Sequence, residues 1–256
     1  MRRKIFKCIL FYVLFHHFSL SAVAQPFISP SNQPLTPLEK SSFTRLTSHT
    51  ELMSYLEKID SLSEKVTFRI IGKSVEGRDI PLIMISDDEI AGSQRSKKPI
   101  VLIYAQQHGD EPSGKEAALM LIRELAAGSL QDLLQNLDVM IVPMVNPDGA
   151  ERGRRRNASD QDLNRDHAIL SEPESYALHS WFLEWMPEVT VDVHEYNAIK
   201  KEWISNGFIK DAEEMLGGVT NLNIAPQLIS FARGVFMPAV GKLLQKEGFT
   251  FHRYSV

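Results

Sequence analysis

The sequence is almost free of cysteine and carries no strong excess of either charge. Cys8 is the only cysteine among 256 residues, and it lies in an N-terminal stretch that we expect to be removed. The remaining chain then has no thiol, which excludes disulfides and thiolate metal sites, so any metal must be held by His, Asp or Glu side chains. A net charge of −4 with 43% hydrophobic residues is typical of an ordinary soluble protein and does not indicate nucleic-acid binding.

The N-terminus has the features of a targeting segment. A basic start, Arg2-Arg3-Lys4, precedes an apolar run over residues 5–20, and Ala22-Val23-Ala24 supplies a small-x-small cleavage pattern. The run is short and interrupted by Lys7 and two histidines, so we expect no permanent membrane span and a secreted or periplasmic protein. We predict a signal peptide over 1–24, a flexible lead-in rich in Pro, Ser and Asn over 25–37, and one domain over 38–256.

Apolar runs alternate with segments of helical spacing along that domain. We predict strands over residues 66–71, 80–86, 100–103, 139–145 and 188–194, and helices over 50–62, 117–127 and 173–186. The first two strands, joined by a short link that contains glycine, predict a hairpin at one edge of a sheet. Pro143 lies within the fourth strand and favours an edge position or a bulge there. The alternation predicts an α/β sandwich with a largely parallel central sheet.

His108 and Glu111 follow the strand over residues 100–103, on the turn into the next helix. In an open α/β sheet, ligands bind at the carboxyl ends of the strands. An imidazole and a carboxylate three residues apart can converge on one cation, and Zn²⁺ accepts that pair but needs at least one more protein ligand. The alternative is that Glu111 stabilises the first helical turn and that His108 is a surface loop residue.

His194 ends the strand over residues 188–194, 83 residues beyond Glu111. A neighbouring strand that ends in histidine is where a third ligand would come from, although a buried structural histidine is the alternative. Asp192 lies two residues earlier on the same side of the strand, so its carboxylate could orient the imidazole as a hydrogen-bond acceptor.

Arginines gather between residues 152 and 165, in a protein whose net charge is negative. A solvated loop, or a patch for nucleic acid or anionic lipid, would account for them, but no interleaved aromatic residues are present to stack bases. The planar guanidinium suits the binding of a carboxylate, since it can contact both oxygens. Upstream, Asn146-Pro147-Asp148-Gly149 predicts a turn in which proline fixes φ and glycine takes the strained position.

Four motifs in this order resemble the zinc carboxypeptidases of the M14 family, of the carboxypeptidase A type. They are His108-x-x-Glu111, Asn146-Pro147-Asp148-Gly149, Asp162-Leu163-Asn164-Arg165 and the strand-borne His194, and the resemblance covers roughly Thr50 to Tyr196. It implies a three-layer α/β/α sandwich with a mixed, largely parallel sheet. It also implies one Zn²⁺ ion held by His108, Glu111 and His194 at the carboxyl ends of the strands.

The resemblance further implies the substrate and the roles of three side chains. Asn164 and Arg165 match the pair that holds the terminal carboxylate of a peptide substrate. The family's arginine that stabilises the oxyanion matches Arg155, with Arg154 and Arg156 as alternatives. The implied reaction is hydrolysis of the C-terminal peptide bond by water that zinc activates.

One part of the family's pattern is not recognisable, namely its general-base glutamate well beyond the last histidine ligand. The 62 residues 195–256 follow His194, and Glu213, Glu214 and Glu247 there lie in no recognised motif, while Glu195 should point to the opposite side of the strand. We expect an incomplete form of a longer peptidase. The alternatives are a zinc-dependent binding module without turnover, and an amidase or deacylase that acts on cell-wall peptides or N-acyl amino acids.

Overall fold

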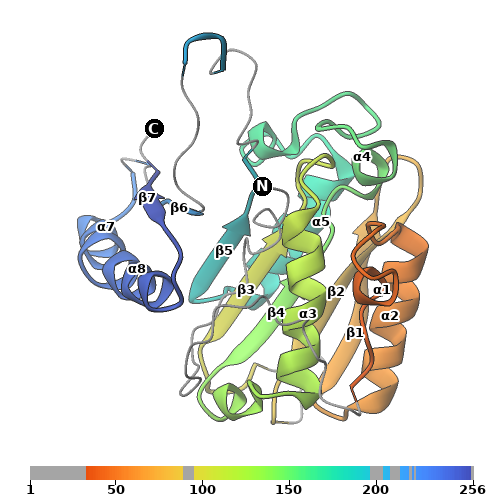
Figure 1. Ribbon diagram of the computed structural model, residues 1–256, viewed down its shortest axis with the longest axis horizontal. Helices are drawn as coiled ribbons and strands as arrows, with labels where there is room; N and C mark the ends of the chain where they lie inside the picture. Colours follow the sequence, from red (N-terminus) through yellow and green to blue (C-terminus); the bar gives the residue numbers. More distant parts are fainter. Residues whose placement is uncertain are drawn as a thin grey trace. The chain divides into compact units, whose positions relative to one another are not determined.

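The computed structural model of the protein describes residues 33–88, 95–196, 204–207, 214–218, 221 and 223–254 (Figure 1). The chain forms two compact units, a larger one that extends to Glu195 and a smaller one from Tyr196 onward. The predicted signal peptide lies outside the described residues, and the division into segments stays a prediction. Within the described ranges, no helix combines the length and the apolar character that crossing a membrane requires.

The larger unit alternates strands and helices, as the sequence predicts. Its elements are α1 (Pro37–Lys40), α2 (His49–Leu62), β1 (Val66–Lys73), β2 (Asp79–Ile85), β3 (Ile100–Ala105), α3 (Ser113–Ala127), η2 (Gln131–Gln135), β4 (Asp138–Val142), α4 (Pro147–Arg152), η3 (Leu163–Arg165), α5 (Pro173–Trp185) and β5 (Val189–Val193). Ser48 caps α2 through a capping box with Glu51, which explains why this helix begins at His49.

The five strands form one mixed sheet in the order β1-β2-β4-β3-β5. β1 and β2 are the predicted antiparallel hairpin at one edge, whereas β3 is parallel to both of its neighbours, β4 and β5. In Figure 1, α2 and α3 lie on one face of this sheet and α5 on the other. The predicted three-layer α/β/α architecture is therefore confirmed.

Alternate strand residues fill the two layers between sheet and helices. On the α5 side, Leu82, Leu102 and Met140 pack with Leu178 and Trp185 in one buried cluster. Because successive side chains point to opposite faces, the intervening strand residues face α2 and α3. Burial of such side chains, at about 25 cal/mol per Å² of apolar surface, holds the helices on the sheet and so fixes the strand ends.

Two local predictions around β4 were wrong. β4 lies inside the sheet, between β2 and β3, and it ends at Val142, so Pro143 follows the hydrogen-bonded ladder and requires neither an edge strand nor a bulge. The four residues from Asn146 form the start of α4, where the Asn146 side chain accepts a hydrogen bond from the Gly149 N–H (2.9 Å). Gly149 is needed for space, since a Cβ there would lie 2.8 Å from the carbonyl oxygens of Arg154 and Arg156.

The smaller unit contains a helical segment and two short strands. Its elements are β6 (Glu214–Leu216), α7 (Pro226–Phe231), the π-helical η4 (Ala232–Phe236), α8 (Met237–Lys246) and β7 (Phe251–Arg253), and β6 pairs with β7 in parallel. α8 ends at Lys246, and Gly248, two residues beyond, has a φ of +83°, a conformation common for glycine just after a helix.

Candidate metal centre

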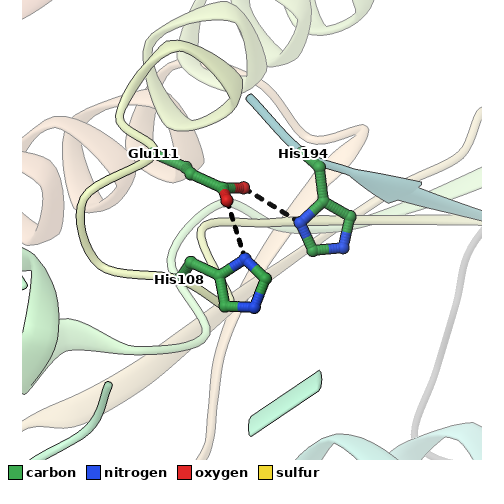
Figure 2. A group of neighbouring side chains, drawn as sticks. All are labelled: His108, Glu111 and His194. Carbon is green, nitrogen blue, oxygen red and sulfur yellow. Dashed lines mark hydrogen bonds and ion pairs between the residues drawn. The ribbon is translucent and has the colours of Figure 1, made fainter. Parts of the chain in front are cut away.

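The parallel pairing of β3 and β5 brings together the polar residues that follow these strands. Ala105 at the end of β3 lies opposite Val193 at the end of β5. His108 lies on the turn after β3, Glu111 lies just before α3, and His194 directly follows β5. Figure 2 shows the Glu111 carboxylate between the two imidazole rings.

The three side chains converge closely enough to share one ion. One ligand atom from each of His108, Glu111 and His194 lies within 4.8 Å of the other two. The Glu111 oxygens are 2.7 Å from His108 Nδ1 and 2.9 Å from His194 Nδ1, the contacts drawn in Figure 2. Two imidazoles and a carboxylate are a donor set of catalytic zinc sites, so these residues fit a zinc ion.

Carboxylates hold the outer nitrogen of each ring. His108 Nε2 lies 3.1 Å from an oxygen of Asp162, and His194 Nε2 lies 3.0 Å from an oxygen of Asp192. A proton that is donated from Nε2 to a carboxylate leaves the Nδ1 lone pair directed at the centre. The predicted contact of Asp192 is confirmed. The role of Asp162 was missed, although an acidic residue two positions before Asn164 was the available signal.

The electrostatics of the metal-free centre favour a carboxylate beside an imidazolium. Burial alone would raise the pKa of Glu111, but hydrogen bonds from His108, His194 and the Glu195 backbone N–H outweigh it and lower the pKa to about 2. Burial opposes the charged form of His194, yet the neighbouring carboxylates of Asp192 and Glu111 raise its pKa to about 10. A cation is therefore well accommodated between these acidic groups.

Arg155 is the arginine of its loop whose guanidinium reaches the centre. Its Nη1 lies 3.1 Å from His108 Nδ1 and 3.3 Å from Glu111 Oε1, and its Nη2 lies 3.2 Å from the second oxygen of Asp162. Of the two alternatives, Arg156 donates to the Asp160 carbonyl instead, and Arg154 is exposed.

Asn164 and Arg165 lie in the η3 turn. Asn164 Nδ2 is 3.0 Å from His194 Nε2, the outer nitrogen of that ring, so this amide lies beside the centre. The exposed Arg165 donates through Nη1 to the Asn164 carbonyl oxygen (2.8 Å). The structure thus brings Asn164 to the metal centre and leaves the guanidinium of Arg165 at the surface beside it.

The Asn146 side chain fastens the arginine loop to the turn after β3. Its Nδ2 donates to the carbonyls of Gln107 (3.1 Å) and Arg155 (3.3 Å), and the Gly109 N–H also donates to the Arg155 carbonyl (3.2 Å). A Cβ on Gly109 would lie 2.1 Å from the backbone of Gly149, so only glycine allows this approach. Sequence reasoning missed this role.

The acidic residues considered for a general base are placed as follows. The Glu195 carboxylate accepts a hydrogen bond from the Ser113 N–H (3.0 Å) at the start of α3. Glu213 lies outside the described residues. Glu214 belongs to β6 and Glu247 follows α8, both in the smaller unit.

The fold and the donor set together define an α/β protein with a centre suited to a single metal ion. The family model described as zinc carboxypeptidase (Peptidase_M14) matches residues 52–200, more than half of the 256 residues. The chain belongs to this family, and the resemblance inferred from the four motifs is confirmed.

Individual relatives agree with this membership. "Carboxypeptidase 2" of Trichophyton rubrum is 29% identical over 185 residues, which are 71% of this chain and 34% of that protein. The chain thus spans about a third of the length of such curated relatives. A metallo-carboxypeptidase of Burkholderia cenocepacia is 26% identical, with a TM-score of 0.53 over 59% of this chain and 41% of that one.

The fold is also that of carboxypeptidase A from Helicoverpa armigera. This crystal structure has a TM-score of 0.64, covers 82% of this chain and 57% of its own, and is 22% identical. At that identity the likeness shows the fold alone, and it agrees with the three layers described above.

Proposed function

We propose that the chain binds one zinc ion through His108, Glu111 and His194 and hydrolyses the C-terminal peptide bond of peptides. The observation that carries this proposal is the convergence of two imidazoles and a carboxylate within 4.8 Å, in a chain that belongs to the zinc carboxypeptidase family. When bound, zinc would supply a Lewis acid for the scissile carbonyl and would activate a water molecule as the nucleophile.

The remaining roles belong to side chains around the three ligands. Arg155, whose guanidinium lies 3.3 Å from Glu111, would stabilise the negative charge that develops on the scissile carbonyl oxygen. Asn164 and Arg165, adjacent in the η3 turn, would hold the free C-terminal carboxylate, which accepts hydrogen bonds from an amide and a guanidinium. The proton acceptor stays a prediction from the resemblance, which calls for a glutamate.

We further propose that the protein acts outside the cytoplasm, on peptides that have a free C-terminus. This follows from the basic start, the apolar run and the small-x-small pattern over residues 1–24. Attachment of these residues to a reporter enzyme, followed by cell fractionation, tests the export. A reporter that stays in the cytoplasm would exclude a signal peptide.

A panel of N-blocked dipeptides tests the reaction. The full chain should release the terminal residue, a chelator should stop the release, and added zinc should restore it. Arg155→Met should lower kcat by about 10²–10³-fold, whereas Arg154→Met, which alters an exposed neighbour, should have little effect. Hydrolysis that a chelator leaves unchanged would refute the proposal.

The same panel, extended with N-acyl amino acids and cell-wall peptides, separates the alternatives. Stoichiometric zinc binding with no hydrolysis of any substrate would establish a binding module. Hydrolysis restricted to N-acyl amino acids or cell-wall peptides would establish a deacylase or an amidase.

A further inference from the structure

Glu195 connects the end of β5 to the beginning of α3 by two hydrogen bonds. Its backbone N–H donates to Glu111 Oε2 (2.9 Å), and its carboxylate accepts from the Ser113 N–H (3.0 Å). One bond thus runs from the β5 segment to the metal-ligand carboxylate, and the other runs from the helix back to the β5 segment. Together they join two stretches that lie more than 80 residues apart in sequence.

The first turn of α3 needs such an acceptor. Its N-cap residue is Pro112, which provides no side-chain hydrogen bond, so the first backbone N–H groups of the helix require partners from elsewhere. A carboxylate at a helix N-terminus also interacts favourably with the helix dipole. The Glu195 side chain supplies this carboxylate from another element of the sheet.

The two segments meet with no room between them. A Cβ on Gly114 would lie 2.8 Å from Val193 Cγ1 and 3.1 Å from the Ala105 Cβ. The first turn of α3 therefore packs directly on the ends of β3 and β5. A small shift of this turn would move the end of β5, and a shift of β5 would move the turn.

We propose that Glu195 is a positioning residue that fixes the separation of Glu111 and His194, and that it is not the proton acceptor of the reaction. Glu111 lies two residues before the Ser113 donor, and His194 directly precedes Glu195, so both ligands move with the segments that Glu195 joins. This inference rests on the proposed metal site. Residues that orient metal ligands commonly change metal affinity by about 10–100-fold when they are mutated.

Glu188 offers a matched control at the other end of β5. Its carboxylate accepts a hydrogen bond from the Ile100 N–H (2.7 Å) at the start of β3. Glu188→Ala therefore removes the same kind of carboxylate-to-backbone bond between β5 and a neighbouring element. This change should lower the temperature of unfolding without altering the metal centre.

Zinc affinity, measured on the full chain by competition with a chromogenic chelator, tests the proposal. Glu195→Ala should weaken binding by about 10–100-fold and change the visible spectrum of the Co²⁺-loaded protein. Glu195→Gln should restore much of the affinity, because its amide oxygen still accepts from Ser113, and it covers the case in which the alanine variant fails to fold. Glu188→Ala should match the wild type in affinity and in spectrum.

Amide hydrogen exchange at Ser113, followed by NMR on the metal-free chain, tests the bond between Glu195 and α3 independently of zinc. The Ser113 N–H should exchange slowly in the wild type and in Glu188→Ala, and faster in Glu195→Ala. Wild-type zinc affinity in a folded Glu195→Ala or Glu195→Gln variant that has lost the slow exchange would overturn the proposal. Equally fast exchange in the wild type and Glu195→Ala would also overturn it, whereas a wild type that binds no zinc would refute the proposed function.

Discussion

Asp162 is the residue whose replacement we expect to disturb the centre most without removing a ligand. One of its oxygens lies 3.1 Å from His108 Nε2 and accepts from the Asn164 N–H at 3.0 Å. The other lies 3.2 Å from Arg155 Nη2. Asp162→Asn keeps the shape of the side chain but replaces one acceptor oxygen with an NH₂ donor. In one orientation of the amide this NH₂ group faces the donating guanidinium of Arg155, and in the other it faces His108 Nε2.

The expected loss follows from these contacts. Replacement of a carboxylate that orients a metal-ligand histidine lowers metal affinity by about 10–100-fold, which corresponds to about 1.4–2.7 kcal/mol. The loss of affinity in Asp162→Asn should lie near the lower value, because one acceptor oxygen remains. The loss of affinity in Asp162→Ala should lie near the upper value, since His108 Nε2 then loses its carboxylate and Arg155 keeps only its contacts with Glu111 and His108.

Zinc affinity by chelator competition, together with a thermal unfolding curve of each variant, measures this loss. Asp160→Asn is the matched control in the same loop. The side chain of Asp160 is 87% exposed and lies 3.6 Å from Arg156, so its replacement should leave zinc affinity unchanged. Equal affinities for the wild type and a folded Asp162→Ala variant would refute the role of this carboxylate.

Three further predictions concern the centre and its support. His194, with its pKa raised to about 10, is protonated at neutral pH in the metal-free chain and must lose that proton to bind zinc. Zinc affinity should therefore rise by about one log unit per pH unit between pH 7 and 9, with a shallower slope in Asp192→Asn; calorimetry that shows equal proton release in both proteins would contradict this. Arg123→Leu should lower the free energy of unfolding, measured in urea, by about 3–5 kcal/mol. The reason is that the buried Glu39 carboxylate, 2.5 Å from the equally buried Arg123 guanidinium, loses its partner. The double replacement with Glu39→Leu should cost less than the sum of the two single replacements, and additivity would disprove the coupling. Gly109→Ala should reduce both stability and zinc affinity, because its Cβ would lie 2.1 Å from the backbone of α4. A variant with unchanged stability and affinity would show that the turn after β3 does not pack this closely on α4.

The layers of the fold follow from the sequence because apolar periodicity reports burial directly. The apolar run from Ile100 became β3, and the helix expected from Thr50 is α2, whose start one residue earlier is set by the Ser48 cap. The position of β4 was not predictable in this way. Pro143 indicated an edge, but the strand ends one residue before it, and only the tertiary pairing shows β4 between β2 and β3.

The convergence of His108, Glu111 and His194 could be predicted, because His194 directly follows β5 and the other two lie on the turn after β3, at the same edge of the sheet. Residues that act through the backbone could not. Asn146 and Gly109 appear in the sequence as turn residues, and their contacts with the Arg155 loop depend on how the loop folds back. Glu195 was expected on the far side of a continuing strand, whereas β5 ends at Val193 and frees the side chain to reach Ser113.

X-ray absorption spectroscopy at the zinc edge, on the zinc-loaded full chain, tests the central claim most directly. We predict two imidazole nitrogens and a carboxylate oxygen at roughly 2.0–2.2 Å from one zinc ion. We also predict that His108→Ala and His194→Ala each remove one imidazole from that shell. A zinc shell that neither replacement changes would show that the metal binds elsewhere and would contradict the account.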